Sequence, residues 1–411
     1  DDLVALLEGP SPGEAIHRDL RGVGIVGRVS SGGDGWLIPD PLGLRCLYYG
    51  ESDRIHAFGS RASLVAQALA GGSHPPKDLE AICWLTHTSY WASDSTGFRG
   101  VRVAQPGSAL CLRRGRPHWE TISRLTPKRG RPRRSVEDVA DAVTADVARS
   151  LRALLDRPAD RHIIQLTGGK DSRLILAIAL QAGLAHQFEY ETTGPPQLAD
   201  VQIAGELTEA LGLRHETRFF GMRSKEPYAG ARIRLASETA GMVNAWDVFS
   251  PVEGDDVRVT GICGELLRAF RKVPQSRRTD GRMAADVFRR DLFGRLGLLR
   301  PDVAEAFHHS LLSRVGGEEP NRVDPLDELH LYFATNRMRF VHAGPLEELA
   351  GNRPFLPLYS LSTARAAMDL GSLDRQSEIL FAEIMRRGSE LLVEHRFTDA
   401  GWDTRATAHL E

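Results

Sequence analysis

From residue 135 onward, apolar residues recur at helical spacing and then fall into short strands separated by helices. Ser135 and Asp138 form a capping box that predicts the start of the first helix. Strands are predicted at residues 162–167, 187–192, 215–219 and 257–261, and the helices between them at 172–182, 200–211 and 229–240. Strands that alternate with helices indicate an α/β fold, a doubly wound parallel sheet with helices on both faces. The remainder, residues 283–394, is predicted to be mostly helical.

The pattern before residue 124 is different, with short strands and turns that predict an α+β segment. Strands are predicted at residues 35–39, 44–49, 54–58, 101–103 and 109–112, with a hairpin connection at 50–53. Short helices are predicted at residues 60–69, capped by Ser60, and at 78–86. The G-x-G-x-x-G run at residues 22–27 has no helix after it, so we interpret it as a glycine-rich strand.

An Arg-, Pro- and Gly-rich segment, RLTPKRGRPRR at residues 124–134, separates these two patterns. We therefore predict an α+β domain at 1–123, a linker at 124–134 and an α/β domain at 135–411. The basic run resembles an AT-hook, but such a run is more often a solvated linker. Lys plus Arg is 52 and Asp plus Glu is 54, which gives a net charge of -2. We therefore do not expect a nucleic-acid partner.

The amino-acid composition narrows the class of protein further. The 411 residues are 42% hydrophobic and 26% charged, which is typical of globular proteins rather than disordered chains. The longest apolar run, residues 174–180, is far shorter than the roughly 20 residues that span a bilayer. With no basic signal region in view, we expect a cytoplasmic protein with no membrane partner, and a homodimer remains open. Four dispersed cysteines without C-x-x-C favour reduced thiols over a zinc site or disulfides.

The strongest chemical signal follows the strand at residues 162–167. The order is Leu166, Thr167, Gly168, Gly169, Lys170, Asp171 and Ser172, so a strand ends, two glycines turn the chain, and a helix begins. Glycine amides and a helix N-terminus attract anions, and hydroxyls can donate to them. Asp171 can hold Mg²⁺, which neutralises phosphate. The spacing differs from a Walker A loop, and we predict a pyrophosphate site.

A second signal follows the strand at residues 257–261. Gly261 ends this strand, and Glu265 and Arg268 come shortly afterwards. If the strand order is 3-2-1-4-5, this segment lies beside the glycine turn at the topological switch point of the sheet. Asp171 and Glu265 would then share one Mg²⁺ ion. Arg268 and Arg173 are weaker candidates for contacts with phosphate or carboxylate, and both could equally be structural or surface residues.

The motif TGGKDS resembles the S-G-G-x-D-S signature of PP-loop ATP pyrophosphatases, with Thr167 in place of Ser. Other segments resemble asparagine synthetases: DPLGLRCLYY at residues 40–49, FGSRASL at 58–64, PGS at 106–108 with the later Trp119, and RPFL at 353–356. Gly261 and Glu265 resemble the G-x-G-x-D-E stretch of that family, but Leu266 replaces the second acid. Thr192 lies at the position where that fold binds adenosine, although a plain polar loop is as good an interpretation.

The resemblance implies an ATP-dependent ligase with an N-terminal amidotransferase-like domain. A carboxylate would attack Mg²⁺-ATP and release pyrophosphate, and an amine would then displace AMP to form an amide. Lys170 would stabilise the leaving group, with Asp171 and Glu265 as the other catalytic residues. Glutaminases of this family use an N-terminal Cys, whereas residue 1 here is Asp, so we expect no glutaminase activity.

Family members that lack this Cys, such as β-lactam synthetases and lasso peptide cyclases, take both carboxylate and amine from peptide or small-molecule substrates. Their resemblance suggests natural-product or peptide biosynthesis. Two alternatives remain open: a glutamine- or ammonia-dependent amidotransferase with a trimmed N-terminus, and a non-catalytic relative that binds a nucleotide or a peptide.

Overall fold

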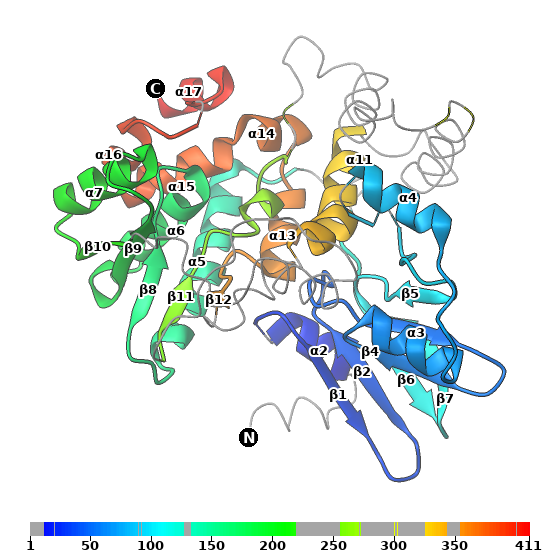
Figure 1. The fold of residues 1–411 in the computed structure, drawn as a ribbon. Coiled ribbons are helices and arrows are strands. Elements are labelled where there is room, and N and C mark those ends of the chain that lie inside the picture. Colours follow the sequence, from blue (N-terminus) through cyan, green and yellow to red (C-terminus); the bar gives the residue numbers. More distant parts are fainter. Residues whose placement is uncertain are drawn as a thin grey trace. The chain divides into compact units, whose positions relative to one another are not determined.

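The chain divides into two compact units in a computed structural model (Figure 1). The first comprises residues 1–126, 226–248 and 273–348, and the second 127–225, 249–272 and 349–411. The residues that the structure describes are 12–19, 21–88, 90–91, 93–126, 133–218, 255–270, 272, 300, 302, 325–342, 354–399 and 401–411. The predicted α/β domain included residues 325–342, but these join the first unit, because Phe340, Leu329 and Tyr332 pack into its core.

A five-stranded sheet in the order β10-β9-β8-β11-β12 forms the centre of the second unit, and all its neighbours pair in parallel. Its strands are β8 (His162–Gln165), β9 (Glu189–Thr193), β10 (His215–Arg218), β11 (Val257–Val259) and β12 (Pro354–Phe355). This is the predicted 3-2-1-4-5 order. The short β12 was not predicted, because the surrounding pattern is helical. The helix predicted at 229–240 and most of the linker lie outside the described residues, so the doubly wound arrangement stays a prediction.

The described part of the second unit also contains helices. They are α5 (Val136–Leu155), α6 (Lys170–Gln181), α7 (Ala199–Ala210), α13 (Leu361–Met368), α14 (Ser372–Ser377), α15 (Ile379–Gly388), α16 (Glu390–Glu394) and α17 (Thr404–Leu410), with 3-10 turns η1 (Ala185–Gln187) and η2 (Gly264–Leu266). The Ser135 side chain accepts a hydrogen bond from the backbone N–H of Asp138, which confirms the predicted cap of α5. Helix α6 begins at Lys170, earlier than predicted, with Gly169 as its N-cap.

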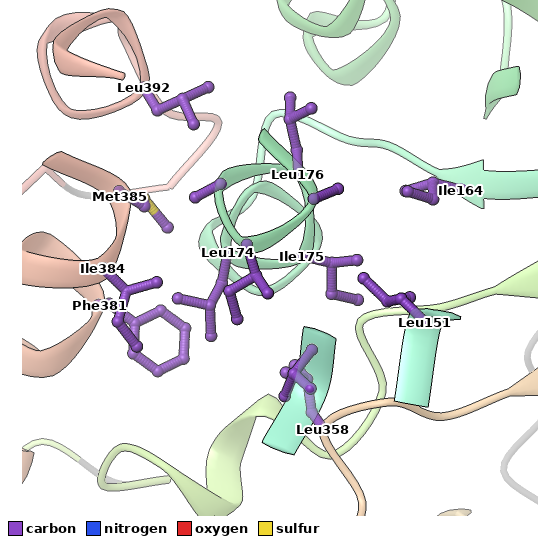
Figure 2. Close-up of a cluster of buried hydrophobic side chains, with 14 of the residues drawn as sticks. Leu151, Ile164, Leu174, Ile175, Leu176, Leu358, Phe381, Ile384, Met385 and Leu392 are labelled. Carbon is purple, nitrogen blue, oxygen red and sulfur yellow. The ribbon is translucent and has the colours of Figure 1, made fainter. Parts of the chain in front are cut away.

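Helix α6 lies at the centre of the core of the second unit (Figure 2). Residues 174–179 of its apolar run are completely buried because other elements contact the helix on several sides, which explains why the run lacks a polar face. The surrounding side chains come from α5, β8, α15 and α16, and include Leu151, Ile164, Phe381, Ile384, Met385 and Leu392. Helix α15 approaches closely because Gly388 has no side chain. A Cβ there would lie 2.7 Å from the Cα of Ala177.

The first unit contains two antiparallel sheets, in the orders β1-β2-β6-β7 and β4-β3-β5. The strands are β1 (Ile25–Val29), β2 (Gly35–Pro39), β3 (Tyr48–Glu51), β4 (His56–Gly59), β5 (Val101–Val103), β6 (Ser108–Arg113) and β7 (Arg116–Thr121). The helices are α2 (Pro12–Asp19), α3 (Ala62–Ala70), α4 (Leu79–Thr88) and α11 (Pro325–Tyr332), which continues as a π-helical turn, Phe333–Arg337. Helix α2 and strand β7 were not predicted.

Most of the strands expected in this unit are present, including the glycine-rich strand β1 and the β3–β4 hairpin. Two details of the prediction for this unit were wrong, the N-cap of a helix and the start of a strand. Helix α3 has Arg61 rather than Ser60 as its N-cap, without a side-chain hydrogen bond. Strand β3 begins later than predicted, because the Asp40 carboxylate accepts hydrogen bonds from the backbone N–H groups of Leu44 and Arg45 and holds them in a turn. None of the described helices has the length and apolarity to cross a membrane.

Candidate functional site

The glycine turn between β8 and α6 is held by its own polar groups. The Ser172 hydroxyl accepts a hydrogen bond from the Thr167 backbone N–H at 3.1 Å and pairs with the Thr167 hydroxyl at 3.0 Å. The backbone N–H of Gly169 donates to that same Thr167 hydroxyl, and that of Gly168 donates to the Asp200 carboxylate at 2.8 Å. The hydroxyls that were expected to face an anion therefore also fix the shape of the loop. This rigid turn places the N-terminus of α6 at the carboxyl end of the central strand.

Glycines also allow the segment after β11 to approach α6 closely. A Cβ at Gly261 would lie 2.8 Å from the backbone nitrogen of Ser172, and one at Gly264 would lie 2.2 Å from Oδ1 of Asp171. A Cβ at Gly168 would lie 2.1 Å from the Thr398 hydroxyl. No side chain fits at these distances without displacing its neighbour. The two predicted site segments therefore meet beside the boundary between β8 and β11, which is the topological switch point of the sheet.

Asp171 forms a two-point ion pair with Arg268 at this junction. Nε and Nη2 of Arg268 donate to the two carboxylate oxygens at 3.1 and 3.0 Å. Burial raises the pKa of Asp171, and the nearby Glu265 carboxylate adds to this rise, whereas Arg268 opposes it. The structure thus brings Asp171 and Glu265 together, as the strand order predicted. The cation that relieves their repulsion here is the Arg268 guanidinium.

Two lysines converge on one buried carboxylate at the same site. Nζ of Lys170 and Nζ of Lys272 each lie 2.6 Å from Oε2 of Glu378, and Nη1 of Arg268 lies 3.5 Å from Oε1. The Glu378 side chain is only 3% exposed, and burial alone would raise its pKa, but the two lysines lower it. Burial lowers the pKa of Lys170. Lys170, Lys272 and Arg268 together form a cationic cluster beside the N-terminus of α6.

The backbone is unusual at two positions of this site. Glu378 joins α14 to α15 with φ of 60°, and Cys263 precedes η2 with φ of 74°. Left-handed conformations are costly for side chains other than glycine, and they persist where the surroundings hold them. Here Glu378 is held by both lysines. Such strain is common at functional sites, so the strained backbone agrees with a functional role for this cluster.

Two predicted site residues have other roles in the structure. Arg173 is buried, and its guanidinium donates to four backbone carbonyls, those of Gly168, Leu392, His395 and Arg396. It therefore ties α6 to the segment after α16 instead of contacting a phosphate or a carboxylate. Thr192 is also buried, and its hydroxyl donates to the Leu166 carbonyl at 2.7 Å, behind the glycine turn. Backbone carbonyls thus accept hydrogen bonds from both side chains in this structure.

Three residues at the site escaped the sequence analysis. Lys272 offered a weak signal, since lysine is rare in this chain and this one comes four residues after Arg268. Asp200 lies in the first turn of α7, where acidic residues are common caps. Glu378 gave no signal, because its role depends on the fold bringing α14 and α15 to the glycine turn.

The fold and the site define an α/β protein with a parallel sheet and a charged cluster at its switch point. No family model matches the chain, and no curated protein matches it. Among solved structures, the chain is similar to an NMN synthetase from Francisella tularensis, with 17% sequence identity and a TM-score of 0.19. That match covers 50% of this chain and 94% of the synthetase chain.

Proposed function

We propose that the second unit binds Mg²⁺-ATP and catalyses attack of a substrate carboxylate on the α-phosphorus, with release of pyrophosphate. An amine then displaces AMP and leaves an amide. The observation that carries this proposal is the cluster of Lys170, Lys272 and Arg268 at the N-terminus of α6, beyond the carboxyl end of β8. Cations, glycine amides and a helix N-terminus suit a leaving group with several negative charges.

The cations would act on pyrophosphate as it leaves. Lys170 and Lys272 share Glu378, so each could turn one N–H bond toward a phosphate oxygen while the other keeps the carboxylate neutralised. Arg268 offers a planar fork that matches phosphate geometry. These groups are already in place before the reaction, so little reorganisation is needed when charge develops.

Magnesium would arrive with ATP. Asp171 and Glu265 supply carboxylate oxygens, the ligands that Mg²⁺ prefers. Each oxygen of Asp171 accepts one hydrogen bond from Arg268 in this structure and keeps a second lone pair for a metal ion. Leu266 is completely buried and offers no ligand. Asp171 and Glu265 would hold the metal, which would neutralise part of the phosphate charge.

The products of ATP turnover test the proposal. We expect Mg²⁺-dependent formation of AMP and pyrophosphate, and exchange of labelled pyrophosphate into ATP when an acceptable carboxylate is present. A panel of amino acids, small acids and peptides would identify the carboxylate class. Formation of ADP and phosphate would contradict the proposed site, because it requires attack at the γ-phosphorus.

A second candidate function is nucleotide or peptide binding without turnover. It is favoured by the closed network in which Arg268 holds Asp171 and Glu378 holds both lysines. Glu265→Gln distinguishes the two. An enzyme should need more Mg²⁺ for exchange after this change, whereas a binding protein should show no exchange in either form while its affinity for ATP remains measurable.

A further inference from the structure

The hairpin of β6 and β7 has a tightly fixed register. It turns at Arg114 and Gly115, which have φ of 51° and 76°, as a two-residue turn of type I′ requires. This register places Cys111 of β6 directly opposite His118 of β7. Glu120 is two residues further along β7 and therefore projects from the same face of the sheet. A thiol, an imidazole and a carboxylate are thus brought together by strand pairing.

These three side chains form a compact cluster. The Sγ of Cys111, a ring nitrogen of His118 and a carboxylate oxygen of Glu120 all lie within 4.8 Å of one another. Nε2 of His118 lies 2.9 Å from Oε1 of Glu120. Cys111 and His118 are partly buried and Glu120 is exposed, so the cluster is open to solvent on one side. An ion could enter it without disturbing the core.

We propose that Cys111, His118 and Glu120 form a Zn²⁺ site, with water as the fourth ligand. Zinc bonds of about 2.0 Å to nitrogen or oxygen and 2.3 Å to sulfur place tetrahedral ligand atoms roughly 3.3–3.6 Å apart. The ligand atoms, which lie within 4.8 Å of one another, would have to reach these separations by side-chain rotation. Thiolate and imidazole select zinc over magnesium or calcium, which bind oxygen ligands.

The electrostatics of the cluster agree with a cation at its centre. Burial, and after it the neighbouring Glu120 carboxylate, raises the pKa of the Cys111 thiol to about 11. When Zn²⁺ binds, the sulfur–zinc bond forms as the sulfur–hydrogen bond breaks, and one proton passes to solvent. Among the described residues, Arg113 also pairs with this carboxylate, with Nη2 3.9 Å from Oε1 of Glu120, and such an exposed pair contributes little.

The wide spacing of the cysteines argued against a zinc site in the sequence. That argument addresses sites with several cysteines, whereas this one needs a single thiol. Its other ligands come from the neighbouring strand, which the sequence pattern did not predict. The site is independent of the proposed ATP chemistry, because the hairpin belongs to the first unit.

Metal binding by the full chain tests this proposal. After chelation and dialysis, we expect one Zn²⁺ per chain by titration calorimetry, with proton release at neutral pH. Co²⁺ in place of Zn²⁺ should give the thiolate charge-transfer absorption and intense visible bands of a tetrahedral site. Cys111→Ser should abolish the charge-transfer band, and His118→Gln should weaken affinity by about tenfold or more, comparable with effects seen around zinc ligands.

Two variants serve as matched controls. His56 and Glu51 also face each other across a hairpin, with Nδ1 of His56 3.5 Å from Oε2 of Glu51, and no cysteine from the described residues joins their cluster. His56→Gln and Cys83→Ser should therefore leave the affinity and the cobalt spectrum unchanged. Circular dichroism verifies that each variant is folded. Unchanged Zn²⁺ affinity and an unchanged spectrum in folded Cys111→Ser would overturn the proposal, as would failure of the wild type to bind.

Discussion

At the residue scale, the candidate site consists of carboxylates that are paired with cationic side chains. Asp171 is paired with Arg268, and Glu378 is paired with Lys170 and Lys272. The sequence singled out Lys170 and Asp171 because they directly follow a glycine pair at a strand end, and Arg268 because it follows the next glycine-containing turn by four residues. It missed Glu378, whose partners are distant along the chain. It left the role of Arg173 open between a ligand contact and a structural role, because sequence does not reveal which arginine side chain is buried against carbonyls.

Asp171→Asn isolates the central charge of this site. We expect ATP–pyrophosphate exchange to fall about a hundredfold, because the variant weakens metal binding and removes the two-point ion pair with Arg268. Exchange rates at several Mg²⁺ concentrations measure the effect. Glu206→Gln is a suitable control, since Glu206 forms ion pairs with His395 and Arg396 on the same unit. Equal rates for Asp171→Asn and wild type would remove Asp171 from the proposed mechanism.

At the element scale, periodicity predicted the order of strands and helices well, because a buried strand and a buried helix each require a run of apolar residues. It failed where an element is short or is fixed by contacts outside itself. Strand β12 has only two residues, and its pairing with β11 gives it its extended form. Strand β7 carries charged and polar residues because much of it is partly exposed, so the alternation is weak.

The close approach of the β11 segment to α6 gives a prediction at this scale. In Gly264→Ala, the new methyl group would meet the Asp171 carboxylate, so we expect exchange activity to fall at least tenfold while the far-ultraviolet circular dichroism stays unchanged. Gly205→Ala is the matched control. It lies within α7, where the nearest heavy atom to its Cβ would be 3.9 Å away, and it should stabilise the helix by about 0.5–1 kcal/mol. Similar activity in both variants would show that η2 does not position Asp171.

At the scale of the whole molecule, composition and the change in pattern near residue 124 indicated two parts. The structure also has two units, each with its own apolar core. The sequence could not show which unit contains residues 325–342. Helical periodicity indicates that a helix has an apolar face, but it does not indicate which core that face packs against. That assignment depends on packing partners such as Trp91 and Tyr90, which are more than two hundred positions away.

Two cores predict two unfolding transitions, and the proposed ligands should separate them. A ligand at one hundred times its dissociation constant stabilises the unit that binds it by about 2.7 kcal/mol. We therefore expect Mg²⁺ with pyrophosphate to raise one calorimetric transition and Zn²⁺ to raise the other. Gly388→Ala identifies the transition of the second unit, which this variant should lower. Its methyl group would collide with the Ala177 backbone in the core of that unit. If both ligands raised the same transition, at least one of the two sites would have to lie in a different unit from the one proposed.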